Sequence, residues 1–358
     1  MLPPRRTLWT LRNEWRHLVR VNPSDRPWQM PFAAALAGGL PVAVGAIFGR
    51  MDYGVLASLA GMVFLYLPQT PLQHRMMWLM SCAFGMVGCF ALGLISHLVP
   101  VLMLPFLVFA TILVTMLCRF YRVGPPASTF FVMSASVGAF SPTTVLEVPL
   151  RVGIFTLGAL LACFVAFFYS VAILRLRRPM PLTPPAPVGF DALVLEPVLI
   201  GVFVGISLAL AQMLHLVRPY WVPVSCLAVI QGMSLRAVWT RQLHRILGTG
   251  AGLGLTWVLL TMPLGHWTIC LMVIGLTFLI ETLVVRHYGI AVVFITPLTI
   301  FLAEAATLGQ GSANEVIMAR FFDTVLGSMV GLIGGVCLHN AQIRNRLRPL
   351  LRRLSPEI

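Results

Sequence analysis

The sequence predicts an all-α integral membrane protein with about twelve transmembrane segments in two parallel six-helix repeats. Of its 358 residues, 58% are apolar and only 10% are charged. Soluble domains carry about a quarter charged residues, so this composition could not cover a water-facing surface. The apolar residues form long runs, and the rare charged residues recur at a nearly constant interval in the two halves. These observations together predict the class of fold.

Twelve apolar runs follow one another along the chain. A helix that crosses a membrane needs about 20 apolar residues, and the second and fifth runs of each half are shorter. We expect these four to be broken or buried helices, which are tolerated where protein surrounds them. The expected segments are Pro31–Gly49, Tyr53–Leu67, Met76–Ile95, Val101–Leu117, Ala127–Phe140, Val152–Leu174, Val198–Leu216, Tyr220–Leu235, Ile246–Leu264, Trp267–Val285, Tyr288–Leu302 and Phe321–Leu338.

The polar segments divide the chain into five parts. The Arg-rich start predicts an amphipathic helix along the cytoplasmic face, and a Pro-rich stretch in the middle predicts an extended linker. The expected parts are a lead-in (1–29), a first membrane repeat (30–174), a cytoplasmic linker (175–193), a second membrane repeat (194–340) and a basic cytoplasmic tail (341–358).

The charges orient the protein. There are 25 basic residues, all of them Arg, against 11 acidic residues, which gives a net charge of +14. With the N-terminus inside, all but four arginines fall on the cytoplasmic side, as the positive-inside rule requires. The sequence therefore predicts a multi-pass protein of the bacterial inner membrane with both termini in the cytoplasm.

The composition also excludes several functions. The arginines flank apolar segments, so we expect membrane lipid as a partner and no nucleic acid. The chain has no Lys, which excludes a P-loop and a Schiff base. The cysteines lie in apolar runs without CxxC spacing, and no Ser/His/Asp set stands out. We expect no metal, no cofactor and no enzyme activity.

The two halves share an internal duplication. Because each half has an even number of segments, both enter the membrane in the same direction, and a substrate path should run near their interface. Five pairs at offsets between 167 and 170 residues are Arg50 with Arg218, Arg75 with Arg245, Tyr121 with Tyr288, Arg151 with Arg320, and Gly158 with Gly327.

Four motifs in the second half carry a family resemblance. They are Tyr220-Trp221-Val222-Pro223, RILGTGAG from Arg245, Thr296-Pro297, and RFFDTVLG from Arg320. In this order they resemble the fusaric acid resistance (FUSC) family of bacterial aromatic acid exporters, in a short form without the cytoplasmic region. Arg245 opens the family motif expected at the cytoplasmic end of its helix.

The resemblance implies a function. It implies an efflux transporter of the multidrug-resistance kind that exports small aromatic or amphipathic carboxylates by proton antiport. It also implies a periplasmic membrane-fusion adaptor and a small membrane protein as partners. A passive anion channel stays open, because plant malate channels are similar in their six-helix unit. A membrane-embedded enzyme and a homodimer also stay open.

Two acidic residues are candidates for proton coupling. Asp323 and Arg320 stand at i and i+3, which predicts an ion pair on one helix face. An acid inside the membrane is a functional candidate, so Asp323 could take a proton and release Arg320 to bind a carboxylate. A static pair that anchors the helix is the alternative. Glu281 could load protons from the cytoplasm, or it could pair with Arg286 at the surface.

Arginines and aromatic residues are candidates for substrate binding. Arg50, Arg151, Arg218 and Arg320 are the four outside arginines, which could form a positive vestibule for anions or meet an adaptor or lipid headgroups. Planar guanidinium groups suit carboxylates. Tyr220 and Trp221 could stack on an aromatic substrate or belong to an interfacial belt.

The remaining candidates concern helix packing and hinges. Thr296-Pro297 lies in mid-segment, where Pro removes a backbone hydrogen bond, so it marks either a substrate site or a harmless kink. Small residues at intervals of four favour close helix packing. The packing or hinge residues are Gly248, Thr249, Gly252, Pro297 and Gly327.

Overall fold

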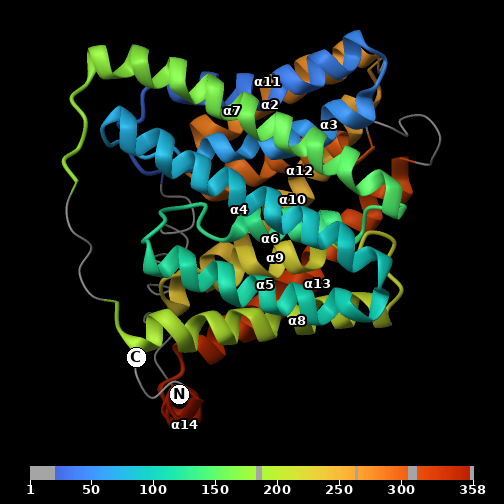
Figure 1. Cartoon of the computed structure of the whole chain (residues 1–358). Coiled ribbons are helices and arrows are strands. Elements are labelled where there is room, and N and C mark those ends of the chain that lie inside the picture. Colours follow the sequence, from blue (N-terminus) through green and yellow to red (C-terminus); the bar gives the residue numbers. More distant parts are fainter. Residues whose placement is uncertain (1–20, 183–187, 263–264, 305–312, 355–358) are drawn as a thin grey trace, which may run out of the picture.

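The computed structural model describes residues 21–182, 188–262, 265–304 and 313–354. Within these ranges the chain forms helices and no strand, and the helices lie side by side in one bundle (Figure 1). The helices of the first half are α2 (Gln29–Ile47), α3 (Met51–Gly61), α4 (Leu72–Leu98), α5 (Pro100–Phe120), α6 (Thr129–Ala139) and α7 (Val148–Leu176), with 3₁₀ turns η1 (Met62–Tyr66) and η2 (Val145–Glu147).

The second half is described from residue 188 onward. It begins with a π-helical turn, η3 (Asp191–Leu195). The helices that follow are α8 (Glu196–Met213), α9 (Trp221–Ile230), α10 (Leu235–Leu260), α11 (His266–Leu283), α12 (Tyr288–Glu304), α13 (Ala313–His339) and α14 (Ala341–Leu354).

Eight helices in the described residues are long and apolar enough to cross a membrane. Four apolar helices are shorter, namely Met51–Tyr66, Thr129–Ala139, Trp221–Ile230 and Tyr288–Leu302. These are the second and fifth segments of each half, which the sequence predicts to be short. The expectation of an all-α multi-pass membrane protein is confirmed, but only eight of the twelve expected segments have the length of a full span.

Three helix pairs in the described residues join the halves. α2 packs against α11, α5 packs against α8, and the short helix α6 packs against the short helix α9. The short helices α6 and α9 lie in the middle of the bundle, where α6 contacts α4, and α9 contacts α13 (Figure 1). A long helix of each half thus packs against the other half, and the short helices α6 and α9 are enclosed between the longer ones.

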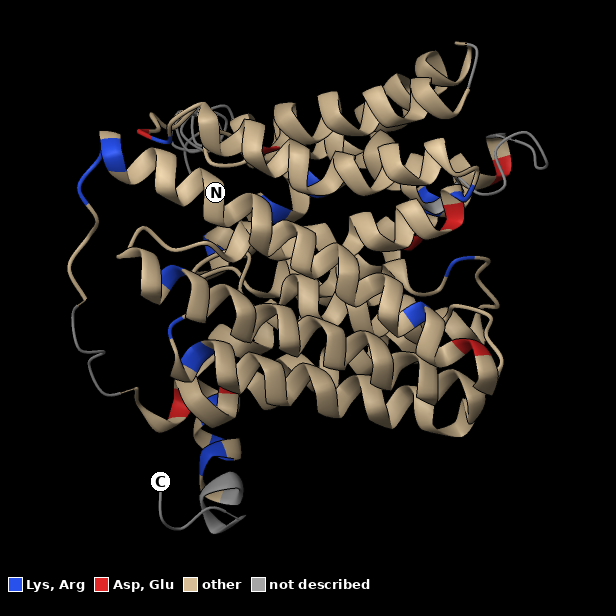
Figure 2. Cartoon of the chain, turned by 45° about the horizontal axis from the view of Figure 1, so that its top comes forward, with Lys and Arg blue, Asp and Glu red and all other residues tan. Residues whose placement is uncertain are grey.

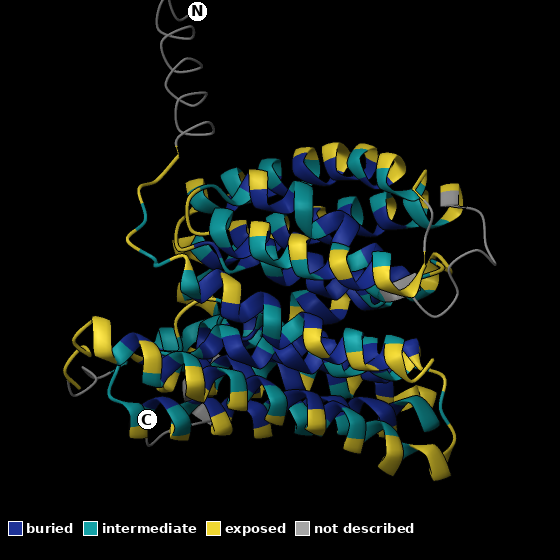
Figure 3. Cartoon of the chain, turned by 90° about the horizontal axis from the view of Figure 1, so that it is seen from above, coloured by how far each residue is buried: buried dark blue, intermediate teal, exposed yellow. Residues whose placement is uncertain are grey.

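Burial follows the pattern of a membrane protein. Buried residues fill the centre, and the exposed residues lie on the outer helix faces and at the ends (Figure 3). Large apolar side chains such as Phe84, Val101 and Leu271 are exposed on long helices. Charged residues gather at the two ends of the bundle, and the middle holds few (Figure 2). An apolar girdle between charged ends suits a lipid bilayer.

The terminal segments attach to one end of the bundle. The predicted lead-in helix falls mostly outside the described residues, since these begin at residue 21. The basic tail forms α14, in which Arg344 donates a 2.7 Å hydrogen bond to Asp191, and Arg348 a 2.9 Å bond. These contacts fix the start of α14 to the turn before α8.

Candidate functional site

Glycines bring α9 and α13 into backbone contact. A Cβ atom added at Gly327 would lie 2.3 Å from the carbonyl oxygen of Val222, and one at Gly331 would lie 2.6 Å from that of Cys226. Only glycine permits such an approach. The interface places the polar residues of α13 directly beside α9.

Glycines also bring α10 and α12 into close contact. A Cβ atom at Gly248 would lie 2.7 Å from the carbonyl oxygen of Gly289, and one at Gly252 would lie 2.7 Å from Cβ of Thr296. Thr249, between them, is buried. Four helices therefore meet closely around one group of buried polar side chains.

Arg320 of α13 contacts an aromatic ring of α9. Its guanidinium carbon lies 3.9 Å from the centre of the Trp221 ring. Arg320 is 5% exposed and Trp221 is 8% exposed. Nε and Nη1 of Arg320 have no hydrogen-bond partner among the described residues. A cation over an indole face is a favourable contact that strengthens away from water, and it leaves these donors unused.

The expected ion pair between Arg320 and Asp323 is not formed. Asp323 is fully buried, and neither of its carboxylate oxygens has a hydrogen-bond partner among the described residues. The spacing does place both residues on one helix face, but the long Arg side chain reaches to Trp221 and the short Asp side chain cannot follow. The structure thus holds a buried cation and a buried acid side by side without a direct bond.

A small cavity joins these groups. Its volume is about 10 Å³, which is room for about one water molecule. An aromatic acid does not fit into it. The lining residues are Arg218, Tyr220, Trp221, Thr299, Ile300, Val316, Arg320 and Asp323. Four predicted substrate residues, Arg218, Tyr220, Trp221 and Arg320, therefore lie together with Asp323.

Arg245 of α10 lies in the same buried region. It contacts α9 at Ser225, one helical turn after Trp221. It is 6% exposed. It donates a 3.0 Å hydrogen bond to Oγ of Ser225 and a 3.2 Å bond to the hydroxyl of Tyr288. The family motif residue expected near a cytoplasmic helix end is thus enclosed by α9 and α12.

Thr296 and Pro297 lie at the contact between α12 and α10. Pro297 stands inside α12. Thr296 is buried, and its hydroxyl donates a 2.9 Å hydrogen bond to the carbonyl oxygen of Val292. The Thr296 hydroxyl is therefore occupied by its own helix, which is the usual contact of Thr in a membrane helix.

Glu281 pairs with a residue that the sequence pattern did not indicate. Its carboxylate accepts a 3.0 Å hydrogen bond from Arg26, which also donates a 2.9 Å bond to the Glu281 carbonyl oxygen. The expected partner was Arg286, but its backbone oxygen accepts a 2.9 Å hydrogen bond from the backbone N–H of Asn22. The segment before α2 therefore covers the end of α11 and supplies the counter-charge of a buried acid.

Two of the four outside arginines lie away from the cavity of Arg320. Arg50 forms a 3.0 Å ion pair with Asp52 and lies over Tyr53, 3.6 Å from the ring centre. Arg151 forms a 3.4 Å ion pair with Glu147. Each is engaged at its own helix start, and neither lines that cavity.

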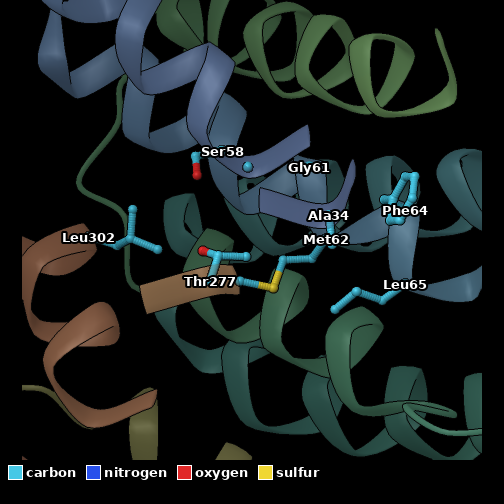
Figure 4. Close-up of a pocket in the computed structure, with 9 residues that line it drawn as sticks. Ala34, Ser58, Gly61, Met62, Phe64, Leu65, Thr277 and Leu302 are labelled. Carbon is cyan, nitrogen blue, oxygen red and sulfur yellow. The ribbon is translucent and has the colours of Figure 1, made fainter. Parts of the chain in front are cut away.

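A second cavity lies where the two halves meet. It has a volume of about 20 Å³ and is enclosed by α2, α3, η1, α11 and α12. Figure 4 shows two polar side chains in its wall, Ser58 of α3 and Thr277 of α11. The remaining wall is apolar, and the cavity has room for about one water molecule.

Sequence reasoning missed Ser225, Tyr288 and Arg26 as site residues. Ser225 stands four residues after Trp221, so helical periodicity could have placed both on one face. Tyr288 was visible as one of the repeated residues. Arg26 carried no signal, because its contact with Glu281 spans 255 residues.

Comparison with known proteins agrees with the motifs. Residues 199–334 match a family described as fusaric acid resistance protein-like. A stretch of 152 residues is 34% identical to a protein of Bacillus subtilis (strain 168) named uncharacterized membrane protein YvaC. This stretch covers 41% of the present chain and 24% of that protein, so the chain spans about a quarter of its relative's length. No solved structure matches the chain.

The family resemblance predicted from the sequence is confirmed for the second half of the chain. The matched range contains α9, α10, α12 and most of α13. It therefore includes Trp221, Arg245, Arg320 and Asp323, the residues that form the buried polar group.

Proposed function

We propose that this protein exports small aromatic or amphipathic carboxylates across the bacterial inner membrane and that protons drive the export. One observation carries the proposal. A buried guanidinium, Arg320, lies over a buried indole ring, Trp221, beside a buried acid, Asp323, with donors and acceptors unused among the described residues. This set can recognise an anion, an aromatic ring and a proton in one place.

Arg320 and Trp221 supply the two contacts that an aromatic carboxylate needs. The planar guanidinium can bind both oxygens of a carboxylate, and the indole offers a face for ring stacking. Tyr220 and Arg218 line the same cavity and extend the aromatic and positive character toward the outside. We assign Arg50 and Arg151, each paired with an acid at its own helix start, to the outer vestibule, where an anion can compete with Asp52 or Glu147 for the guanidinium group.

Asp323 couples the site to protons. When Asp323 is ionised, it attracts Arg320 and competes with the substrate carboxylate. When Asp323 takes a proton, Arg320 is released to bind the anion. Glu281 receives protons on the cytoplasmic side, where Arg26 holds its carboxylate. In an export cycle, Asp323 takes its proton from the outside, and the anion then binds the released Arg320 from the cytoplasm. Asp323 gives the proton up toward Glu281 and the cytoplasm, and its carboxylate then displaces the anion to the outside, so that one proton enters for each anion exported.

Transport requires the helices to separate. The cavity of about 10 Å³ beside Arg320 is far too small for the substrate, so the arrangement corresponds to a closed state. Pro297 lacks the backbone donor that would stiffen α12, and the glycine contacts of α10 and α13 permit sliding. We assign the opening motion to these helices.

The proposed architecture has twelve membrane segments in two parallel repeats. The reciprocal contacts of α2 with α11 and of α5 with α8 support a pseudo-two-fold axis along the membrane normal. The short helices α3, α6, α9 and α12 complete the count as enclosed segments. Both termini are assigned to the cytoplasm by the positive-inside rule. The outer face would meet a periplasmic adaptor and a small membrane protein, and a homodimer would suit a symmetric adaptor.

A transport assay tests the proposal. Purified protein in inside-out-oriented liposomes is offered a panel of radiolabelled aromatic carboxylates, with and without an acidic lumen. Protein-free liposomes correct for passage of protonated acid through the lipid. The proposal expects concentrative uptake that a protonophore abolishes. Flux that follows only the anion's own gradient would contradict proton coupling and favour the passive channel.

A further inference from the structure

Trp221 and Ser225 hold two different guanidinium groups on one face of α9. Trp221 lies under Arg320, and Ser225 accepts a hydrogen bond from Arg245. Because the two residues are four positions apart, their spacing along α9 is about 6 Å. Two cations from α10 and α13 are thus aligned along a third helix.

This buried region carries an excess of positive charge. No described acid forms an ion pair with Arg245 or Arg320. Asp323 is the acid that lines the cavity, and Arg218 lines the same cavity. Arg245, Arg320 and Asp323 alone sum to one positive charge, or to two when Asp323 is protonated. Buried charges are costly without compensation. The excess therefore calls for an anion with up to two negative charges.

Arg245 also has unused hydrogen-bonding capacity. Its Nε has no partner among the described residues, and the residue is only 6% exposed. Arg75, the repeat counterpart of Arg245, differs because it donates to the Thr70 carbonyl oxygen at 2.6 Å and to Ser170 at 3.5 Å.

We propose that Arg245 is a second anion-binding residue, and that Arg245 and Arg320 together select ligands with two carboxylates on one aromatic ring. One carboxylate binds Arg320 beside Trp221, and the other binds Arg245 beside Ser225 and Tyr288. A dicarboxylate balances both guanidinium charges when Asp323 is protonated. The inference rests on the proposed function and names its substrate class.

Equilibrium binding of isophthalate and of benzoate to the purified protein in nanodiscs tests this inference. We expect wild type to bind isophthalate at least about tenfold more tightly than benzoate, because a second charge-assisted contact is added. Arg245→Gln should lose this preference and still bind benzoate on Arg320. Arg75→Gln is the matched control, since it removes the repeat-related buried arginine, and it should keep the preference.

A second variant keeps the inference testable if Arg245→Gln does not fold. Tyr288→Phe keeps the Arg245 charge and frees one of its donors, so isophthalate should bind at least as tightly as to wild type. Equal affinities for both ligands in wild type, or an unchanged preference in a monodisperse Arg245→Gln, would overturn the inference and leave the proposed function standing. Absence of any carboxylate binding by wild type would overturn the proposed function together with the inference.

Discussion

The guanidinium of Arg320 lies 3.9 Å from the centre of the Trp221 ring, and both residues are buried. The contact joins α13 to α9 and leaves two nitrogen atoms of Arg320 without a partner among the described residues. An arginine used only as an anchor would be expected to satisfy its donors. The relationship therefore defines the centre of the proposed carboxylate site.

Replacement of Trp221 should weaken transport in proportion to the loss of the ring. Trp221→Leu removes the ring face on which the substrate is proposed to stack, a contact of about 0.5–1.5 kcal/mol, so the substrate concentration for half-maximal uptake should rise by up to about tenfold. Trp221→Phe keeps a ring and should lie between Leu and wild type. Initial uptake rates into liposomes measure this order, and equal values for Leu and Phe would contradict the role of the ring.

Arginines at the outer side should differ in importance. Arg151 pairs with Glu147 and lies away from the cavity, whereas its repeat counterpart Arg320 is buried in the site. Arg151→Ala should therefore retain most of the export activity, and Arg320→Ala should lose it at equal expression. Export rates normalised to membrane protein content measure the difference. An inactive Arg151→Ala beside an active Arg320→Ala would reverse the assignment.

Packing of α13 on α9 should not tolerate a side chain at Gly327. A Cβ atom there would lie 2.3 Å from a backbone oxygen that cannot move aside easily. Gly327→Ala should reduce the free energy of unfolding by about 1–3 kcal/mol. Gly250→Ala is the matched control, because a Cβ atom at Gly250 meets nothing within 4 Å. Thermal unfolding in detergent compares the two, and equal melting temperatures would refute the close contact.

Arg26 should stabilise the protein only while Glu281 is charged. Arg26→Ala leaves the buried Glu281 carboxylate without its partner. Because Arg26 is partly exposed, we expect a loss of about 1–3 kcal/mol, below the full cost of breaking a buried pair. The double variant Arg26→Ala/Glu281→Gln should recover much of this loss. A double-variant cycle by thermal unfolding tests the pair, and strictly additive effects would show that the two residues act independently.

Much of the architecture could be predicted from local patterns. Apolar runs located the helices, including the short second and fifth segments, because helix length and composition are local properties. Family motifs located Arg320, Asp323 and Arg245. The contacts of these residues could not be predicted, since rotamers and helix packing decide them. The spacing of Arg320 and Asp323 indicated an ion pair, but Trp221, 99 residues earlier, holds the guanidinium.

Simultaneous measurement of carboxylate and proton movement tests the central claim most directly. Inside-out-oriented liposomes with a luminal pH dye are given a radiolabelled aromatic carboxylate that the transport panel identifies. We predict that protons leave the liposome lumen as the carboxylate enters the lumen. In Asp323→Asn, carboxylate exchange should persist without proton movement, and in Arg320→Ala both should stop. Undiminished proton coupling in Asp323→Asn, or carboxylate uptake without proton movement in wild type, would contradict the account.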